Sequence, residues 1–164
     1  MDYVDEIIIV GNPNYKTREL INPYLIKHPD KVKLIWREWD SNYGKARQYA
    51  LDNTKGEWIL QIDADEVLEG GEHLKTVISS AINKNMKVLN IVYEHFIWHL
   101  GLLDNTVEVH YGRNRLFNRI ETKYSAVIHE LAHSDSWVNE DTLLRVTRDK
   151  LKLWHLGYMK SRQT

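Results

Sequence analysis

The chain has 164 residues, of which 43% are hydrophobic and 27% charged, and its formal net charge is −1. These proportions are typical of a soluble globular protein of one domain, and the near-neutral charge gives no general attraction to nucleic acid or to anionic membranes. The absence of cysteine excludes disulfides, thiolate metal sites and thiol nucleophiles. No stretch is apolar enough to span a bilayer, so we expect a cytoplasmic protein without a transmembrane segment.

The first part of the chain alternates between predicted strands and helices. The strands are the apolar runs 6–10 and 32–36 and the run from Trp58 into Asp63, and the helices are 17–27 and a segment that ends at Asn53. Pro23 favours a late start or a kink in the first helix, and Asp40 and Ser41 are expected N-caps of the second. This order predicts an α/β fold with a mostly parallel sheet flanked by helices.

The second part of the chain is richer in strands and less regular. A helix is expected over residues 71–83, because its apolar residues share one face. The expected strands are 88–98, 107–111, 114–119, 125–128 and 151–155, and 142–146 is either strand or helix. We therefore predict a single domain over residues 1–164, with a parallel α/β half (1–70) followed by a strand-rich half (71–164).

Two acidic residues, Asp63 and Asp65, follow the apolar strand that begins at Trp58. Side chains alternate along a strand, so both carboxylates are expected to point the same way, at the strand end where open α/β sheets bind ligands. Converging carboxylates repel each other unless a cation or a proton lies between them, and oxygen ligands suit Mg²⁺ or Mn²⁺. A divalent-ion site is one interpretation, and an acidic loop that keeps the strand end solvated is the other.

Four segments carry a resemblance to the family 2 glycosyltransferases of the GT-A fold, particularly the lipopolysaccharide-core glucosyltransferase-like members. They are DEIIIVGNPNYKT, WDSNYGKARQYALDNTKGEWILQIDADEVL, RNRLFNR and AVIHEL. The resemblance implies a GT-A-like, Rossmann-like sheet with the nucleotide sugar bound by residues 1–70 and the acceptor by 71–164. It implies a metal-dependent, inverting hexosyltransferase, with a UDP-sugar as the favoured donor and a glycan or lipid-linked acceptor, as in cell-surface glycan synthesis.

The resemblance also assigns roles around the donor. It implies that Asp63 lies near the donor ribose and sugar, and that Asp65 binds the Mn²⁺ or Mg²⁺ that bridges the two phosphates. Lys45 and Arg47 match a basic helix beside the donor, with solvated helix charges as the alternative. Asp40 matches a position that approaches the base or ribose, with the N-cap role as its alternative.

Three further residues are candidates for the reaction. Transfer requires a carboxylate base for the acceptor hydroxyl, and Glu130 is the candidate, with an exposed glutamate that follows a strand as the alternative. Asp63, placed near the donor, is the other predicted catalytic residue. His155 follows an apolar strand and is a candidate metal ligand, with a structural histidine as the alternative. Arg115 is a candidate phosphate clamp, with a structural ion pair as the alternative.

The chain departs from the resembled family in two ways. Residues 11–14 read Gly-Asn-Pro-Asn where many members have an acidic turn. From the resemblance we also expect that the family's first strand and helix are missing, and that this strand would lie between the strands expected over 7–10 and over the run into Asp63. We expect these strands to pair directly or another chain to fill the gap, as in a homo-oligomer, and donor binding to be weak and indifferent to the base.

Two other functions fit parts of the sequence. The residues from Asp63 to Val67 match the first motif of haloacid-dehalogenase-like phosphatases, in which Asp63 would be the nucleophile and Asp65 the acid/base. That motif normally follows the first strand, whereas here it follows the third. The other alternative is a non-catalytic domain that binds nucleotide sugars or a partner.

Overall fold

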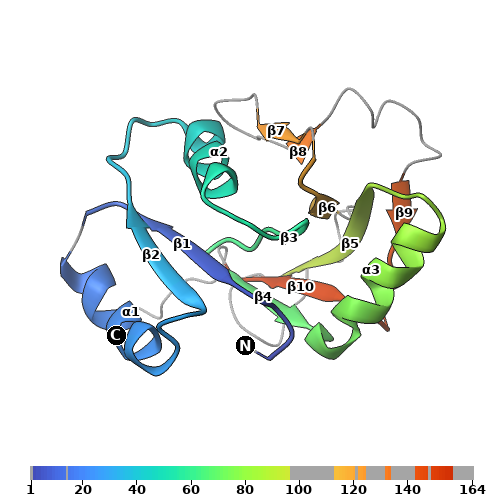
Figure 1. Cartoon of the computed structure of the whole chain (residues 1–164), viewed down its shortest axis with the longest axis horizontal. Helices are drawn as coiled ribbons and strands as arrows, with labels where there is room; N and C mark the ends of the chain where they lie inside the picture. The colour runs from blue at the N-terminus through green and yellow to red at the C-terminus, as the bar shows by residue number, and fades with distance from the viewer. Residues whose placement is uncertain are drawn as a thin grey trace. The chain divides into compact units, whose positions relative to one another are not determined.

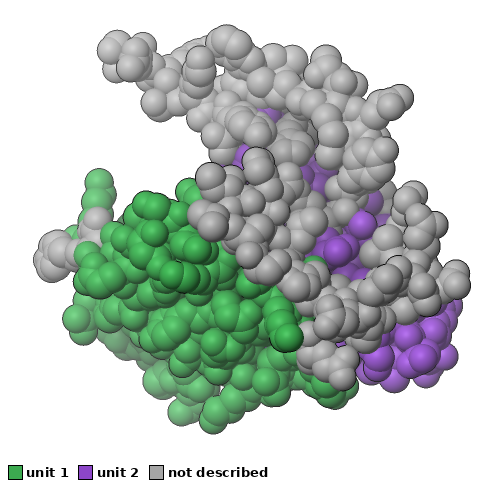
Figure 2. Space-filling model, turned by 90° about the horizontal axis from the view of Figure 1, so that it is seen from above, with its two compact units in different colours: residues 1–57, 119–134 green, residues 58–118, 135–164 purple. Residues whose placement is uncertain are grey.

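The computed structural model describes residues 2–13, 15–96, 113–120, 122–124, 132–133, 143–147 and 149–156. The chain divides into two compact units, one formed by residues 1–57 and 119–134 and the other by 58–118 and 135–164 (Figure 2). The single domain with halves 1–70 and 71–164 stays a prediction. None of the described helices is long and apolar enough to cross a membrane.

The first unit is built on a parallel pair of strands. Its elements are β1 (Ile7–Gly11), α1 (Tyr15–Lys27), β2 (Val32–Trp36), α2 (Tyr43–Asp52), β7 (Lys123–Tyr124) and β8 (Ala132–His133). β1 pairs with β2 in parallel, with Ile7 opposite Val32, while α1 contacts β2 and α2 contacts β1 (Figure 1). β7 and β8 form an antiparallel pair, and the backbone N–H of Tyr124 donates to the side chain of Gln48 on α2 at 2.9 Å.

Both helices of this unit differ from the prediction at their starts. α1 begins at Tyr15 and continues through Pro23, so the expected late start is wrong. α2 is capped by Asn42, whose side chain accepts a hydrogen bond at 2.9 Å from the backbone N–H three residues on. The cap is therefore neither Asp40 nor Ser41, and Ser41 instead adopts a left-handed φ of 59°. An Asx cap next to the helix satisfies an N–H group that has no partner within the helix.

The second unit is built on a six-stranded sheet. Its elements are β3 (Trp58–Leu60), β4 (Glu66–Glu69), the 3-10 helix η1 (Gly71–His73), α3 (Leu74–Asn83), β5 (Val88–His95), β6 (Arg113–Asn118), β9 (Leu143–Arg145) and β10 (Lys152–His155). The strand order is β3-β6-β5-β10-β4, and β9 also pairs with β5 (Figure 1). β10 and β9 run parallel to β5, while the pairs β3–β6, β5–β6 and β10–β4 are antiparallel. This sheet is mixed rather than mostly parallel.

The core of the second unit lies on the central strands and α3. Its buried apolar residues include Leu89 and Ile91 of β5, Leu116 and Phe117 of β6, Leu153 of β10, and Leu74, Val77 and Ala81 of α3. The α3 residues recur at helical spacing, and their burial confirms the apolar face predicted for 71–83. Burial of these side chains is the main favourable contribution to the stability of the unit.

Several expected strands are changed or cannot be compared. β3 ends at Leu60 and does not continue into Asp63, and β4 follows it as an additional short strand. Residues 143–145 form a strand, which decides between the two alternatives for that segment. Among the described strands β1 pairs with β2 alone and β3 with β6 alone, so the direct pairing of β1 with β3 is not observed there. The expected strands 107–111 and 125–128 lie outside the described residues.

Gly70, which follows β4, has a conformation and an environment that exclude a side chain. Its φ is 84°, and a Cβ atom at this position would lie 1.9 Å from the backbone oxygen of Lys150. We predict that Gly70→Ala lowers the free energy of unfolding by roughly 2 kcal/mol or more, because it adds backbone strain and a clash with backbone. Urea denaturation measures the change. The control is Glu72→Ala, at an exposed position, which should change the free energy of unfolding by less than about 0.5 kcal/mol. Equal midpoints for the two variants would contradict this explanation.

Candidate active site

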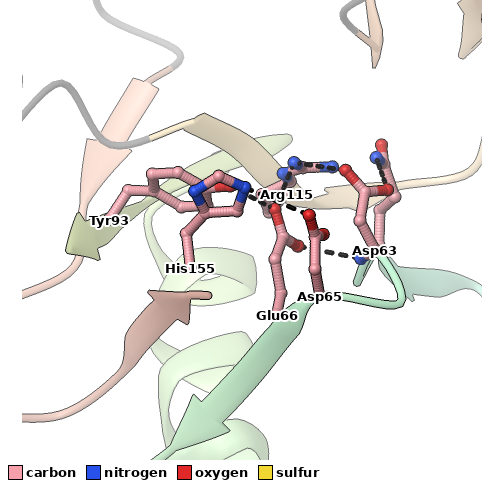
Figure 3. A network of polar contacts seen from close by, with 7 residues as sticks. Asp63, Asp65, Glu66, Tyr93, Arg115 and His155 are labelled. Atoms are coloured by element: carbon pink, nitrogen blue, oxygen red, sulfur yellow. Dashed lines mark hydrogen bonds and ion pairs between the residues drawn. The ribbon is translucent and has the colours of Figure 1, made fainter. Parts of the chain in front are cut away.

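The acidic residues gather where the chain turns from β3 into β4 (Figure 3). The turn is closed by a hydrogen bond of 3.0 Å from the backbone N–H of Glu66 to the carbonyl of Asp63. Asp63 and Asp65 lie within this turn, not on a strand. The strand alternation that led us to expect both carboxylates to point the same way therefore does not apply to them.

Arg115 on β6 joins two of the carboxylates. Its Nη2 atom lies 2.6 Å from Oε1 of Glu66 and 2.9 Å from Oδ2 of Asp63, and its side chain is only 4% exposed. Burial acts to lower the pKa of Arg115, but the charges of Asp63 and Glu66 outweigh it and hold the pKa above its usual value. Arg115 is therefore a fixed positive charge inside the site. The structure shows the ion-pair alternative for this residue, and contact with the donor stays a prediction.

Glu66 is the centre of the network, and sequence reasoning gave it no role. Its side chain is fully buried. Besides Arg115, it accepts a hydrogen bond of 2.5 Å from the hydroxyl of Tyr93 and one of 2.8 Å from the backbone N–H of Asp63. The sequence held a partial signal for Tyr93. It lies at every-second-residue spacing from Leu89 and Ile91 in an apolar strand, so it shares their face and should point inward.

Asp65 and His155 form the second part of the site. Nε2 of His155 lies 3.3 Å from Oδ2 of Asp65, and the backbone N–H of Leu156 donates to the carbonyl of Asp65 at 2.8 Å. His155 ends β10, where it pairs with Glu66 on β4, and its ring stacks on that of Tyr93 with 5.5 Å between centroids. About half of the Asp65 side chain is exposed, whereas His155 is mostly covered. The Asp65 carboxylate is therefore open to solvent, while His155 and the backbone of Leu156 hold this residue in place.

The donor atoms of the site fit part of a divalent-ion shell. Within the described residues no group of three or more His, Asp or Glu side chains is placed to hold a metal ion. Asp65 and His155 offer one oxygen and one nitrogen ligand, and Asp63 is engaged by Arg115. Mg²⁺ is often held by only one or two carboxylates, with substrate phosphates and water completing its shell. An ion at this turn would need such ligands from a substrate.

The other predicted residues belong to the first unit. Asp40 pairs there with Arg37 at 2.8 Å and with Lys45 at 3.6 Å. The hydrogen bond from Arg37, and then the charges of Arg37 and Lys45, lower the pKa of Asp40. Arg47 lies on α2 and is half-buried. Glu130 lies outside the described residues, so its role stays a prediction.

A parallel strand pair with two helices in one unit, and a mixed sheet with α3 in the other, make this an α/β protein. The sequence model described as glycosyl transferase family 2 matches residues 1–96, which is more than half of the chain. The chain belongs to this family, which implies the GT-A α/β fold and supports a glycosyltransferase rather than the phosphatase alternative. No curated protein matches the chain.

The buried arginine provides a test of the network. Removing its charge leaves the carboxylates of Glu66 and Asp63 close together without their shared cation. We predict that Arg115→Gln lowers the free energy of unfolding by about 3–5 kcal/mol, the usual cost of removing one partner of a buried ion pair. Urea denaturation followed by circular dichroism measures this loss. Arg119→Gln, at an exposed position on the same chain segment, should cost about 1 kcal/mol or less. A similar small loss in both variants would show that the Arg115 pairs contribute little.

Proposed function

We propose that the protein transfers a hexose from a nucleotide-sugar donor, with a UDP-sugar favoured, to a hydroxyl of a glycan or lipid-linked acceptor with inversion at the sugar. The family supplies the reaction class. The observation that carries the finer proposal is the acidic turn, where Asp65 is exposed and backed by a buried network. We propose that this turn faces the diphosphate of the donor.

Charge supports a role for a divalent ion in this reaction. Arg115 pairs with the carboxylates of Asp63 and Glu66, and Asp65 adds a third carboxylate at the same turn, so the formal charges of these four side chains sum to minus two (one minus three). A diphosphate is itself an anion, and it would be repelled from such a turn without a cation. Mn²⁺ or Mg²⁺ is therefore part of the proposal, with Asp65 and His155 as its protein ligands and Asp63 as an additional carboxylate.

The residues of the chain have separate tasks in the proposed reaction. When bound, the ion would supply electrostatic stabilisation of the charge that develops on the leaving diphosphate. Asp63, restrained by Arg115, would orient the ribose and sugar of the donor. Asp40, Lys45 and Arg47 of the first unit are proposed donor contacts, and Glu130 is the proposed base that accepts the proton of the acceptor hydroxyl.

The metal assignment is tested at Asp65. Asp65→Asn keeps the shape of the side chain but removes its charge, so we predict that the stabilisation of the protein by UDP with Mn²⁺ is lost. Thermal unfolding with and without UDP and Mn²⁺ measures this stabilisation, because a ligand that binds only the folded state raises the midpoint. Asp30→Asn, in an exposed turn, is the matched control and should respond like the parent. Equal stabilisation of Asp65→Asn and the parent would remove Asp65 from the metal site.

The base assignment is tested at Glu130. In the hydrolysis of a UDP-sugar, water takes the place of the acceptor hydroxyl, the base accepts its proton and UDP leaves. Glu130→Gln should slow this release of UDP by roughly 10²–10⁴-fold, the usual contribution of acid–base catalysis. UDP affinity in calorimetry should hardly change, since the base acts on the acceptor. A variant with parental turnover would exclude Glu130 from the mechanism. A parent that binds UDP with Mn²⁺ but never releases it from a UDP-sugar would favour the non-catalytic binding alternative.

A further inference from the structure

We propose that Glu66 is a positioning residue, which holds the turn carrying Asp63 and Asp65 in the conformation that binds the diphosphate of the donor. The inference rests on the proposed function and adds a residue to it. Glu66 cannot itself touch a donor, because its side chain is fully buried. Its influence on binding must therefore act through the two aspartates.

The first argument is that the Glu66 carboxylate gathers donors from three separate parts of the second unit (Figure 3). Its Oε1 atom accepts from Tyr93 on β5 at 2.5 Å and from Arg115 on β6 at 2.6 Å. Its Oε2 atom accepts from the backbone N–H of Asp63 at 2.8 Å. One side chain thus ties the turn to two strands of the sheet.

The second argument is that the turn is closed from both directions. The backbone N–H of Glu66 donates to the carbonyl of Asp63, and the backbone N–H of Asp63 donates to the side chain of Glu66. These reciprocal bonds resemble the two bonds of a helix capping box, in which a side chain and the backbone satisfy each other. They restrict the backbone of the segment that carries Asp63 and Asp65.

The third argument is that both aspartates depend on groups that Glu66 holds. The Nη2 atom of Arg115 donates hydrogen bonds to both Glu66 and Asp63, so the position of Glu66 determines where the guanidinium contacts Asp63. Asp65 is held through Leu156 and His155 at the end of β10. That strand end pairs with β4 at Glu66, so a shift of Glu66 would disturb the support of Asp65 as well.

Burial gives these contacts their strength. With Glu66 fully buried and Arg115 only 4% exposed, the hydrogen bonds to the carboxylate are charge-assisted and shielded from water. A neutral amide at position 66 has one oxygen and one NH₂ group, so it cannot accept from Asp63 on one side and from Arg115 and Tyr93 on the other. At least one of these buried donors would then lose its acceptor.

The test compares Glu66→Gln with two other variants. Glu69→Gln is the matched control, because Glu69 lies on the same strand, has a side chain that is 58% exposed, and contacts Trp154 and Lys152 instead. Tyr93→Phe removes a single donor to Glu66 and leaves those of Arg115 and Asp63. This milder change keeps the proposal testable if Glu66→Gln does not fold.

Two measurements are made on each variant that circular dichroism shows to be folded. Hydrogen exchange of the amides of Asp63 and Leu156 reports on the turn without any ligand, and calorimetry reports the affinity for UDP in Mn²⁺. In Glu66→Gln we expect faster exchange at both amides and affinity reduced by about 10- to 100-fold, as for residues that orient metal ligands. Tyr93→Phe should lose roughly 2- to 10-fold in affinity, and Glu69→Gln should match the parent in both measurements.

Three other results would contradict either the role of Glu66 or the proposed function. Faster exchange in Glu66→Gln with parental UDP affinity would show that Glu66 has only a structural role, and the inference would be wrong. Unchanged exchange would show that Glu66 does not hold the turn, which also overturns it. A parent that binds no UDP in Mn²⁺ would overturn the proposed function, and the inference with it.

Discussion

The site depends on one buried pair of opposite charges, the carboxylate of Glu66 and the guanidinium of Arg115. Removing two charges from water costs several kcal/mol each, and the cost is recovered only when the charges meet closely and their other hydrogen-bonding groups are satisfied. Here Tyr93 and the backbone of Asp63 supply further donors to the carboxylate. The arrangement joins β4, β5 and β6, so the acidic turn is supported by the sheet itself. Groups held in this way are already oriented before a ligand arrives.

The strand order of the second unit brings the remaining part of the site into place. β10 lies between β5 and β4, and this insertion sets His155 opposite Glu66 and within 3.3 Å of Asp65. The family match ends at residue 96, so it includes the acidic turn but neither Arg115 nor His155. The family match therefore covers the segment that carries the carboxylates, and the fold brings the cation of Arg115 and the imidazole of His155 next to them.

Much of the first unit could be predicted from local sequence alone. The run 32–36 forms the expected strand, and the parallel pair of β1 and β2 agrees with the parallel arrangement that the strand–helix alternation predicts. The mixed sheet of the second unit could not be predicted in this way. The direction in which two strands pair depends on the path of the chain between them, and β5 pairs with β6, β9 and β10 from distant parts of the sequence. β4 was missed because a four-residue strand with two glutamates gives a weak apolar signal.

For the site, the sequence by itself determined that Asp63 and Asp65 stand together after an apolar strand, because that spacing is local. It did not determine where their side chains point, since the expected strand ends at Leu60 and the aspartates lie in a turn. Only the tertiary structure decided that Asp63 meets Arg115 and that Asp65 meets His155. The physical reason is that the partner of a charge is chosen by distance in space, and strand order and register bring together residues that are 52 and 90 positions apart in the chain (115 − 63 and 155 − 65).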